Sequence, residues 1–258
     1  MVIEKVYNSN LLKGTGLVQE MLVLIDEYQG EETSIEFQKK VIEKDLLAKS
    51  TENRVIDIVR NVFANRFMNY EMNVPTILHK MRENYVSINV ITQLFYIYTC
   101  RANLILGDFV KEIYFPFVKK GYQKIETNDP KEFIRRSISD GKIPTMWSDS
   151  TISKVSEHII ASLIDFLLLE KNKNILPIRM IDNTANYLVH ELHFRGFSDN
   201  EIWQHEDWEL FGLGTRDVIT IIERLSYQGA FVFQFSGELL KLDWKNNSME
   251  EFIENECR

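Results

Sequence analysis

Residues 207–244 read DWELFGLGTRDVITIIERLSYQGAFVFQFSGELLKLDW, and the spacing of their apolar residues changes partway along. Behind Thr215, which can cap a first helical turn, aliphatic side chains follow at helical spacing: Val218, Ile221, Ile222 and Leu225. After Gly229 the apolar residues alternate, as in a half-buried strand: Phe231, Phe233 and Phe235, then Leu240, Leu242 and Trp244. The stretch predicts a helix that runs directly into a β-hairpin.

The register of this hairpin follows from Gly237-Glu238, which suits a type II′ turn because glycine tolerates the positive φ of the first central position. The expected apolar pairs are Phe235 with Leu240, Phe233 with Leu242, and Phe231 with Trp244. The other face pairs Gln234 with Lys241 and Val232 with Asp243, and should meet solvent or a ligand. Because a lone hairpin is marginally stable in water, its apolar face should pack on the preceding helices.

Helical spacing dominates the rest of the chain. Helices are expected at about 16–28, 34–44, 52–67, 75–82, 88–106, 128–140, 149–169, 182–195, 198–205 and 215–228, with a short one between Gly107 and Pro116 and caps at Ser34, Ser87, and Asp149 or Ser150. The predicted fold is mainly α: an N-terminal helical bundle followed by a helical C-terminal region that ends in a winged-helix-like β-hairpin.

The winged-helix-like module should cover about residues 182–245, because helix, turn, helix and hairpin follow one another there. The alternative is a hairpin that only closes a helical core. Glycine and proline within 141–144 coincide with a change in charge balance, so we expect domains at 1–142 and 143–258.

The charge of the chain is uneven. Its 45% hydrophobic and 26% charged residues are typical of a soluble globular protein, with a net charge of −8. Residues 1–142 contain 20 Lys and Arg against 19 Asp and Glu, whereas residues 143–258 contain 10 against 19. Since cations supply most nonspecific affinity for nucleic acid, any DNA contact should rely on the N-terminal half.

The sequence favours a cytoplasmic protein. Two cysteines, Cys100 and Cys257, make no disulfide framework, and the first residues, MVIEKVYNSN, have no signal-peptide pattern. The apolar windows at 90–106 and 159–169 are interrupted or too short to span a membrane.

No pattern of catalytic residues is found. His190 and His193 are three residues apart, whereas a metallopeptidase helix needs histidines four apart, and His205 and Asp207 would complete a metal site only if the fold brought them close. The Gly14-Thr15-Gly16 segment lacks a preceding strand and a phosphate-binding lysine, so it is interpreted as a helix cap. We expect no enzyme activity, cofactor or metal.

Basic residues are the remaining candidates for a binding site. In the N-terminal half, cations accompany Tyr122 or form pairs that could face phosphates: Lys119, Lys120, Lys124, Arg135 and Arg136, together with Lys39, Lys40 and Lys44. In the winged-helix-like module, the side chains that DNA would meet are Arg216, Gln228, Lys241 and Lys245. The alternative is that these are ordinary solvated side chains.

Several of these stretches resemble BrxA, the family of small accessory proteins of bacteriophage-exclusion (BREX) defence systems. The resemblance rests on WSDSTISKVSEHIIASLIDFLLL at 147–169, YLVHELHFRGFSD at 187–199, the whole of 205–244, SMEEF at 248–252 and, more weakly, GLVQEMLVLIDEY at 16–28, and is most specific in the C-terminal third. It implies a mostly helical, cytoplasmic, DNA-binding protein without enzyme activity, whose N-terminal bundle is similar to helical domains of transcription antitermination.

The resemblance also implies partners, namely DNA and the methyltransferase, ATPase and phosphatase-like subunits of the system. The acidic C-terminal half argues against strong DNA binding by that half alone. The alternative hypothesis is a protein–protein adaptor without nucleic-acid contact, with an interface made by the hairpin edge and the region of Asp207 and Trp208.

Overall fold

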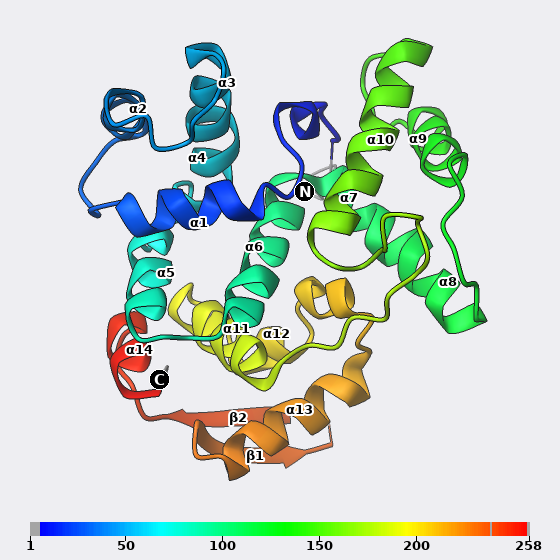
Figure 1. The fold of residues 1–258 in the computed structure, drawn as a ribbon. Coiled ribbons are helices and arrows are strands. Elements are labelled where there is room, and N and C mark those ends of the chain that lie inside the picture. The colour runs from blue at the N-terminus through cyan, green and yellow to red at the C-terminus, as the bar shows by residue number, and fades with distance from the viewer. Residues whose placement is uncertain (1–5, 238, 257–258) are drawn as a thin grey trace. The chain divides into compact units, whose positions relative to one another are not determined.

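The computed structural model describes residues 6–237 and 239–256, which form a mainly α fold with one two-stranded antiparallel sheet near the C-terminus (Figure 1). The predicted fold class is confirmed. Contacts divide the chain into two compact units: unit 1 is Met1–Asn69 with Phe95–Ile178, and unit 2 is Tyr70–Leu94 with Arg179–Arg258. Cys257 lies outside the described residues, as do the first five residues of MVIEKVYNSN.

The regular elements in the described part of unit 1 are helices, joined by loops that form two isolated β-bridges. Its elements are η1 (Asn10–Lys13), α1 (Val18–Glu27), α2 (Ser34–Glu43), α3 (Glu52–Ile56), η2 (Asp57–Phe63), α4 (Ala64–Phe67), the second part of α6 (Ile88–Ala102), α7 (Leu104–Phe109), η3 (Val110–Tyr114), α8 (Phe115–Lys120), α9 (Asp129–Ser139) and α10 (Asp149–Asp165). The segments η2 and η3 are π-helical turns that join their neighbours without a break. The expectation that Gly107 and Pro116 bracket a helix is therefore wrong, because both lie within the continuous run from α7 to α8.

Several helix boundaries differ from the expected ones; α10, for example, ends at Asp165 rather than at residue 169. Helix α6 ends at Ala102 because Asn103 leaves helical geometry, with φ −132° and ψ 82°. Helix α10 is capped by Ser148, whose hydroxyl accepts a hydrogen bond from the Thr151 amide, rather than by Asp149 or Ser150. Thr33, not Ser34, caps α2 through a reciprocal pairing with Glu36.

The Gly14-Thr15-Gly16 segment crosses a buried arginine. Arg66 is 1% exposed, and its guanidinium donates to the carbonyls of Gly16 (2.7 Å) and Thr15. On the other side, Asp165 accepts a hydrogen bond from the Gly16 amide at 2.8 Å, and a Cβ on Gly16 would lie 2.3 Å from the Asp165 Cβ. Glycine is required here for close approach, and the capping role falls to Leu17, which precedes α1.

The expected boundary near residue 142 falls inside unit 1. Helices α9 and α10, on either side of it, pack against each other. The Tyr7 amide donates to the Lys142 carbonyl at 2.8 Å, so the N-terminal segment also contacts this stretch.

Unit 2 combines helices with the hairpin. Its elements are α5 (Val74–Glu83), the first part of α6, α11 (Asp182–Phe194), α12 (Asp199–Trp203), η4 (Glu206–Phe211), α13 (Thr215–Tyr227), β1 (Phe231–Ser236), β2 (Leu239–Trp244) and α14 (Met249–Glu256). Gly214, not Thr215, caps α13, because its amide donates to the Asp217 carboxylate. Helix α14 contacts α5 and α11 and was not expected from the sequence.

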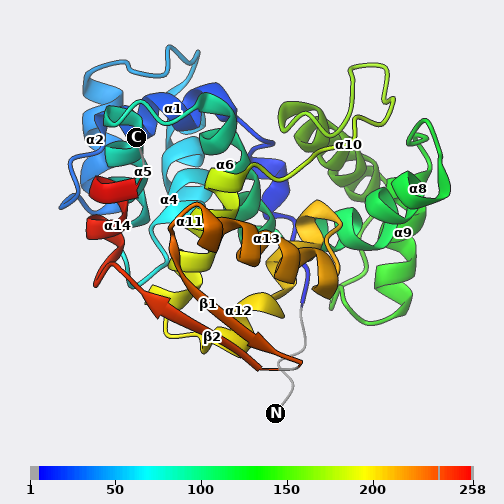
Figure 2. The ribbon, with the colours of Figure 1, turned by 90° about the horizontal axis from the view of Figure 1, so that it is seen from below.

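The hairpin register is the expected one, with Phe235 opposite Leu240, Phe233 opposite Leu242 and Phe231 opposite Trp244. Gly237 has φ +66°, as the proposed turn requires, whereas Glu238 lies outside the described residues. The strands share one core with α11, α12 and α13, and Figure 2 shows the hairpin from below. The apolar face is buried near its base but opens toward the turn, where Phe235 is 39% exposed.

The outer edge of β2 is covered by the start of α12. The Leu242 amide donates to the Asp199 carboxylate and the Leu240 amide to the Asn200 side chain, each at 2.9 Å. These side chains satisfy strand amides that would otherwise lack partners within the protein.

His190 is part of the core of unit 2. Its ring is fully buried, stacks on Phe252 with centroids 4.0 Å apart, and directs Nδ1 toward the Asn186 carbonyl. Burial lowers the pKa of His190 to about 4. The side chain is therefore neutral at neutral pH.

Replacing a core leucine and an exposed leucine of the same strand tests this packing. Leu242→Ala should lower the free energy of unfolding by about 2–4 kcal/mol, because it leaves a cavity beneath the hairpin. Leu239→Ala, at a position 66% exposed, should change it by no more than about 0.5 kcal/mol. Urea denaturation followed by circular dichroism measures both; equal effects would contradict the assigned faces.

The pH dependence of unfolding tests the buried histidine. An unfolded His190 takes up a proton below its ordinary pKa of 6.5, whereas the folded one does so only near pH 4, so stability is full above pH 6.5 and is lost as pH falls toward 4. Between pH 7 and pH 5, burial of neutral His190 should lower the free energy of unfolding by about 2 kcal/mol. In His190→Phe the urea midpoint should change less with pH over this range. A pH dependence equal to that of the original protein would refute the burial of His190 as its cause.

Candidate nucleic-acid interface

The nine candidate residues fall in both units, so each group is described by itself. Unit 1 contains Lys119, Lys120, Lys124, Arg135 and Arg136, and unit 2 contains Arg216, Gln228, Lys241 and Lys245. Within each unit, the relevant question is whether the charged group is available to a ligand or already bound to a protein acceptor.

Lys119 and Lys120 form the last turn of α8, which ends at Gly121 in the left-handed conformation. Both side chains are exposed, and no acceptor for either is found among the residues that the structure describes. Tyr122 follows, 54% exposed, with its ring stacked on Phe117 at a centroid distance of 4.6 Å. Two available cations therefore adjoin an accessible aromatic ring.

A second segment pairs with this one. Lys124 forms an isolated antiparallel bridge with Asn174, the Ile125 amide donates to the Lys173 carbonyl at 3.1 Å, and the Ile175 amide donates to the Gln123 carbonyl at 2.9 Å. This pairing adds two cations that the sequence analysis missed, Lys171 and Lys173. We call Lys119, Lys120, Lys124, Lys171 and Lys173 the basic cluster.

The members of the basic cluster are not equally available. Lys124 lies 3.8 Å from the Glu126 carboxylate, and Lys173 donates to the Thr127 hydroxyl. Lys171 is exposed, as are Lys119 and Lys120. A pairing of loops nearly 50 residues apart in the chain leaves no periodic signal, which explains why the second segment was missed.

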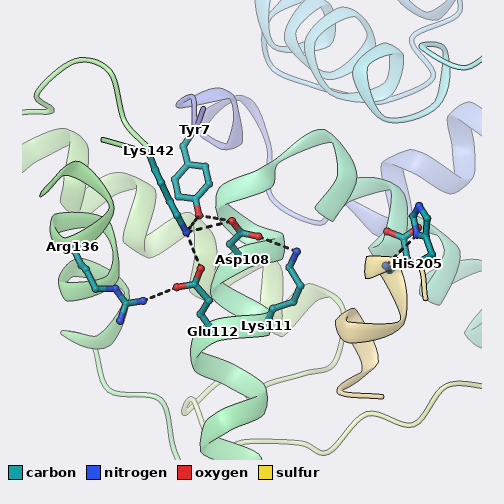
Figure 3. A network of polar contacts seen from close by, with 8 residues as sticks. Tyr7, Asp108, Lys111, Glu112, Arg136, Lys142 and His205 are labelled. Carbon is teal, nitrogen blue, oxygen red and sulfur yellow. Dashed lines mark hydrogen bonds and ion pairs between the residues drawn. The ribbon is translucent and has the colours of Figure 1, made fainter. Parts of the chain in front are cut away.

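The two neighbouring arginines are bound to carboxylates. Arg135 lies 3.7 Å from Asp149, and Arg136 donates to Glu112 at 2.7 Å. The Glu112 carboxylate also accepts a hydrogen bond of 2.9 Å from Lys142. Arg136 therefore belongs to a network of polar side chains (Figure 3). Any phosphate contact by Arg136 would have to compete with this ion pair.

The same network holds the N-terminal segment. The Tyr7 hydroxyl donates to Asp108 at 2.5 Å, and Lys111 lies 3.0 Å from the same carboxylate (Figure 3). Burial alone would raise the pKa of Asp108, but the hydrogen bonds from Tyr7 and Lys111 and the charge of Lys142 bring it below its ordinary value. Asp108 is thus ionised, and side chains of the protein bind its carboxylate.

Other cations of the N-terminal half are also paired. Lys40 lies 3.0 Å from Glu32 and 3.4 Å from Glu27, and Lys44 is bound to Glu27. Lys39 is exposed on α2.

In unit 2, three of the four candidates are engaged within the protein. Gln228 donates to Asp182 at 3.0 Å, Lys241 lies 3.6 Å from Asp243, and Lys245 donates to the Gly229 carbonyl. Arg216, exposed in the first turn of α13, has no acceptor among the described residues.

The balance of charge separates the two units more sharply than it separates the two halves of the sequence. Unit 1 contains 21 Lys and Arg against 21 Asp and Glu, whereas unit 2 contains nine against 17. The whole net charge of −8 therefore belongs to unit 2. Unit 2 repels a polyanion overall, and unit 1 does not.

The histidines have structural contacts. His193 stacks on Trp244 with centroids 3.8 Å apart, and His205 Nδ1 lies 3.2 Å from the Asp207 carboxylate. Over residues 6–237 and 239–256, no three His, Cys, Asp or Glu side chains converge as metal ligands would. Cys100, whose thiol could also bind a metal, is buried.

The region of Asp207 and Trp208 is also part of the core, contrary to the expectation that it forms an interface. Asp207 is 3% exposed and Trp208 is 1% exposed, and the Trp208 indole donates to the Ile202 carbonyl at 2.7 Å. An interface in unit 2 would have to use other residues.

No helix in the described part of the chain has the length and apolar character that crossing a bilayer requires.

Comparison with known proteins identifies the family. A solved structure of an uncharacterized protein from Magnetospirillum magneticum matches with a TM-score of 0.58 at 16% identity, over 73% of this chain and 95% of that one, and so shares its fold. No curated protein matches. The model of the BrxA family matches residues 5–191, a range that ends in α11 and excludes the 205–244 stretch, where the resemblance was most specific. Because this match covers more than half of its length, the chain belongs to the BrxA family and is a protein of bacteriophage-exclusion defence.

Proposed function

We propose that this protein is a non-enzymatic, cytoplasmic accessory component of its defence system that binds duplex DNA through the basic cluster. The observation that carries the proposal is the pair Lys119 and Lys120. These are exposed cations without a described protein acceptor, in the unit that has no net negative charge. Lysines of this kind bind phosphate oxygens and release the counterions that surround DNA.

The geometry of the cluster favours recognition of the DNA backbone over recognition of bases. Its lysines lie on a helix end and two paired loops, not on a helix face that could enter the major groove. Tyr122 adds an exposed ring that can pack on sugar or on an unstacked base. Binding of this type is sensitive to salt and nearly independent of sequence.

The winged-helix-like module makes a smaller contribution in this proposal. Its α13 corresponds in order to the helix that reads bases in winged-helix proteins, and Arg216 extends from its first turn. Around it, however, Asp217 and Glu223 are acidic, and Arg224 is bound to Asp182. We expect Arg216 to add a phosphate contact rather than sequence specificity.

A second function is supported by a different observation. Unit 2 is acidic and exposes apolar side chains on its hairpin, with Val232 53% exposed and Leu239 66% exposed. This combination suits docking of another protein. We propose that unit 2 binds another subunit of the defence system, the methyltransferase, ATPase or phosphatase-like protein. Co-purification that persists after nuclease treatment would support docking; co-purification lost with the nucleic acid would contradict it.

Charge reversal tests the proposed DNA contact. The double variant Lys119→Glu/Lys120→Glu should weaken binding of duplex DNA about tenfold or more at low salt, equally for unrelated sequences. It should also reduce the slope of log K against log salt concentration by about 2, since two phosphate contacts are lost. Fluorescence anisotropy with labelled duplexes at several salt concentrations measures both quantities.

The matched control is Arg60→Glu/Lys154→Glu, which changes the net charge equally at two other exposed cations of unit 1. It should retain most of the affinity. Equal loss in both double variants would mean that only net charge matters, and absence of any affinity in the unchanged protein at low salt would refute DNA binding.

A further inference from the structure

The two edges of the hairpin differ. The register places Phe235 opposite Leu240 and Phe233 opposite Leu242, and the amides of both leucines donate outward, to Asn200 and Asp199. In an antiparallel ladder, residues of such a pair both direct their backbone groups away from the partner strand. The amides and carbonyls of Phe233 and Phe235 therefore line the opposite edge, that of β1.

This edge of β1 has no partner in the described part of the protein. Among the described residues the sheet has two strands, and none of these residues forms a hydrogen bond there with the Phe233 or Phe235 backbone. Phe235 is 39% exposed, and Gln234 and Ser236 are exposed too. Helix α13 also contacts β1, but it forms no described hydrogen bond with this edge, and the residues of β1 from Gln234 to Ser236 are exposed.

The sequence of β1 does nothing to block pairing. Proteins usually protect a free edge with lysine, proline, a bulge or a covering element. Here β1 reads FVFQFS, without charge or proline and with an unbroken register, whereas β2 carries Lys241 and Asp243 and is covered by α12 as well. Helices contact both strands, but only the outward amides of β2 are hydrogen-bonded by a neighbouring helix.

We infer that the β1 edge binds an extended segment of a partner protein, which adds to the hairpin as a third strand. Backbone hydrogen bonds to Phe233 and Phe235 would hold the segment. Its side chains would alternate between the partly exposed Phe233 and Phe235 on one face and Val232 and Gln234 on the other. The inference rests on the second proposed function, docking by unit 2, and names its mode.

Charge identifies the kind of segment. Unit 2 has 17 acidic against nine basic residues, and Arg224, Lys241 and Lys80 each lie within ion-pair distance of a carboxylate. A segment with alternating apolar and basic residues complements this unit, whereas a second copy of the chain would bring a second acidic unit to the same edge. The occupant is therefore a basic strand of another protein.

Amide exchange on the full chain tests the free edge. With nitrogen-15 in phenylalanine and leucine, the amides of Phe233 and Phe235 should exchange about tenfold faster or more than those of Leu240 and Leu242. Equal protection of all four would overturn the inference, because the edge would then already be occupied.

Peptide binding tests the addition of a strand. A labelled peptide of seven alternating valine and lysine residues should bind and protect the Phe233 and Phe235 amides. The same peptide with alternate amides methylated, and one with glutamate for lysine, should bind about tenfold more weakly or not at all. Equal binding of the methylated peptide would overturn the inference in favour of plain charge attraction.

A pair of variants separates the backbone from the side chain. Phe235→Ala removes the ring and keeps the outward amide, whereas Phe235→Pro also removes that amide without breaking a bond to β2. The proline variant should bind the peptide about tenfold more weakly than the alanine variant, with both folded by circular dichroism. Equal binding of the peptide by both variants would overturn the inference. It would also be overturned if the unchanged protein formed a dimer that Phe235→Pro abolished and Phe235→Ala did not, since a second copy would then be the occupant.

Failure of the inference can be told apart from failure of docking. If subunits of the system co-purify equally with both Phe235 variants, unit 2 docks partners by another surface and strand addition is refuted. If no subunit co-purifies with the unchanged protein while the peptide still binds at the edge, docking of those subunits is refuted and strand addition stands.

Discussion

A two-stranded hairpin cannot bury its own apolar face, and the architecture of unit 2 depends on that constraint. Phe231, Leu240 and Leu242 lose contact with water only because α11, α12 and α13 form one core with them. Each buried aliphatic or aromatic side chain contributes about 1.5–3 kcal/mol, more than the strand pairing could supply by itself. The helices thus determine how the hairpin is held.

The packing of the hairpin on these helices determines which of its edges and side chains remain accessible. The start of α12 covers the edge of β2 with Asp199 and Asn200, so the free edge is that of β1. His190 and His193, which a metal site would have used, pack instead on Phe252 and Trp244. Trp208 fills the interior rather than a surface. Packing therefore accounts for most of the residues that stood out chemically in unit 2.

The two units differ in net charge and in how many of their candidate side chains are already bound within the protein. Unit 2 carries the whole net charge, and three of its four candidate side chains are held by acceptors of the protein. In unit 1, Arg136 is held in the same way by Glu112, while Lys119 and Lys120 remain available. A cation that is already paired must give up that pair to bind phosphate, so pairing matters more than the number of basic residues.

The sequence by itself determined the features that depend on local spacing. The change from a period of 3.6 to a period of 2 near Gly229 located α13, both strands and their register, because neighbouring residues alone decide which side chains share a face. Most other helices were predicted for the same reason. Exact ends were less predictable, since a cap such as Gly214 with Asp217 depends on a single hydrogen bond.

Only the tertiary structure decided the features that join distant parts of the chain. The addition of Lys171 and Lys173 to the basic cluster, the burial of Trp208, the contacts of α14 and the free edge of β1 each depend on long-range pairing. Gly16 belongs here as well, because its lack of a side chain permits the close approach to Asp165. Such contacts depend on the free energy of the whole folded structure, and no local pattern of residues encodes them.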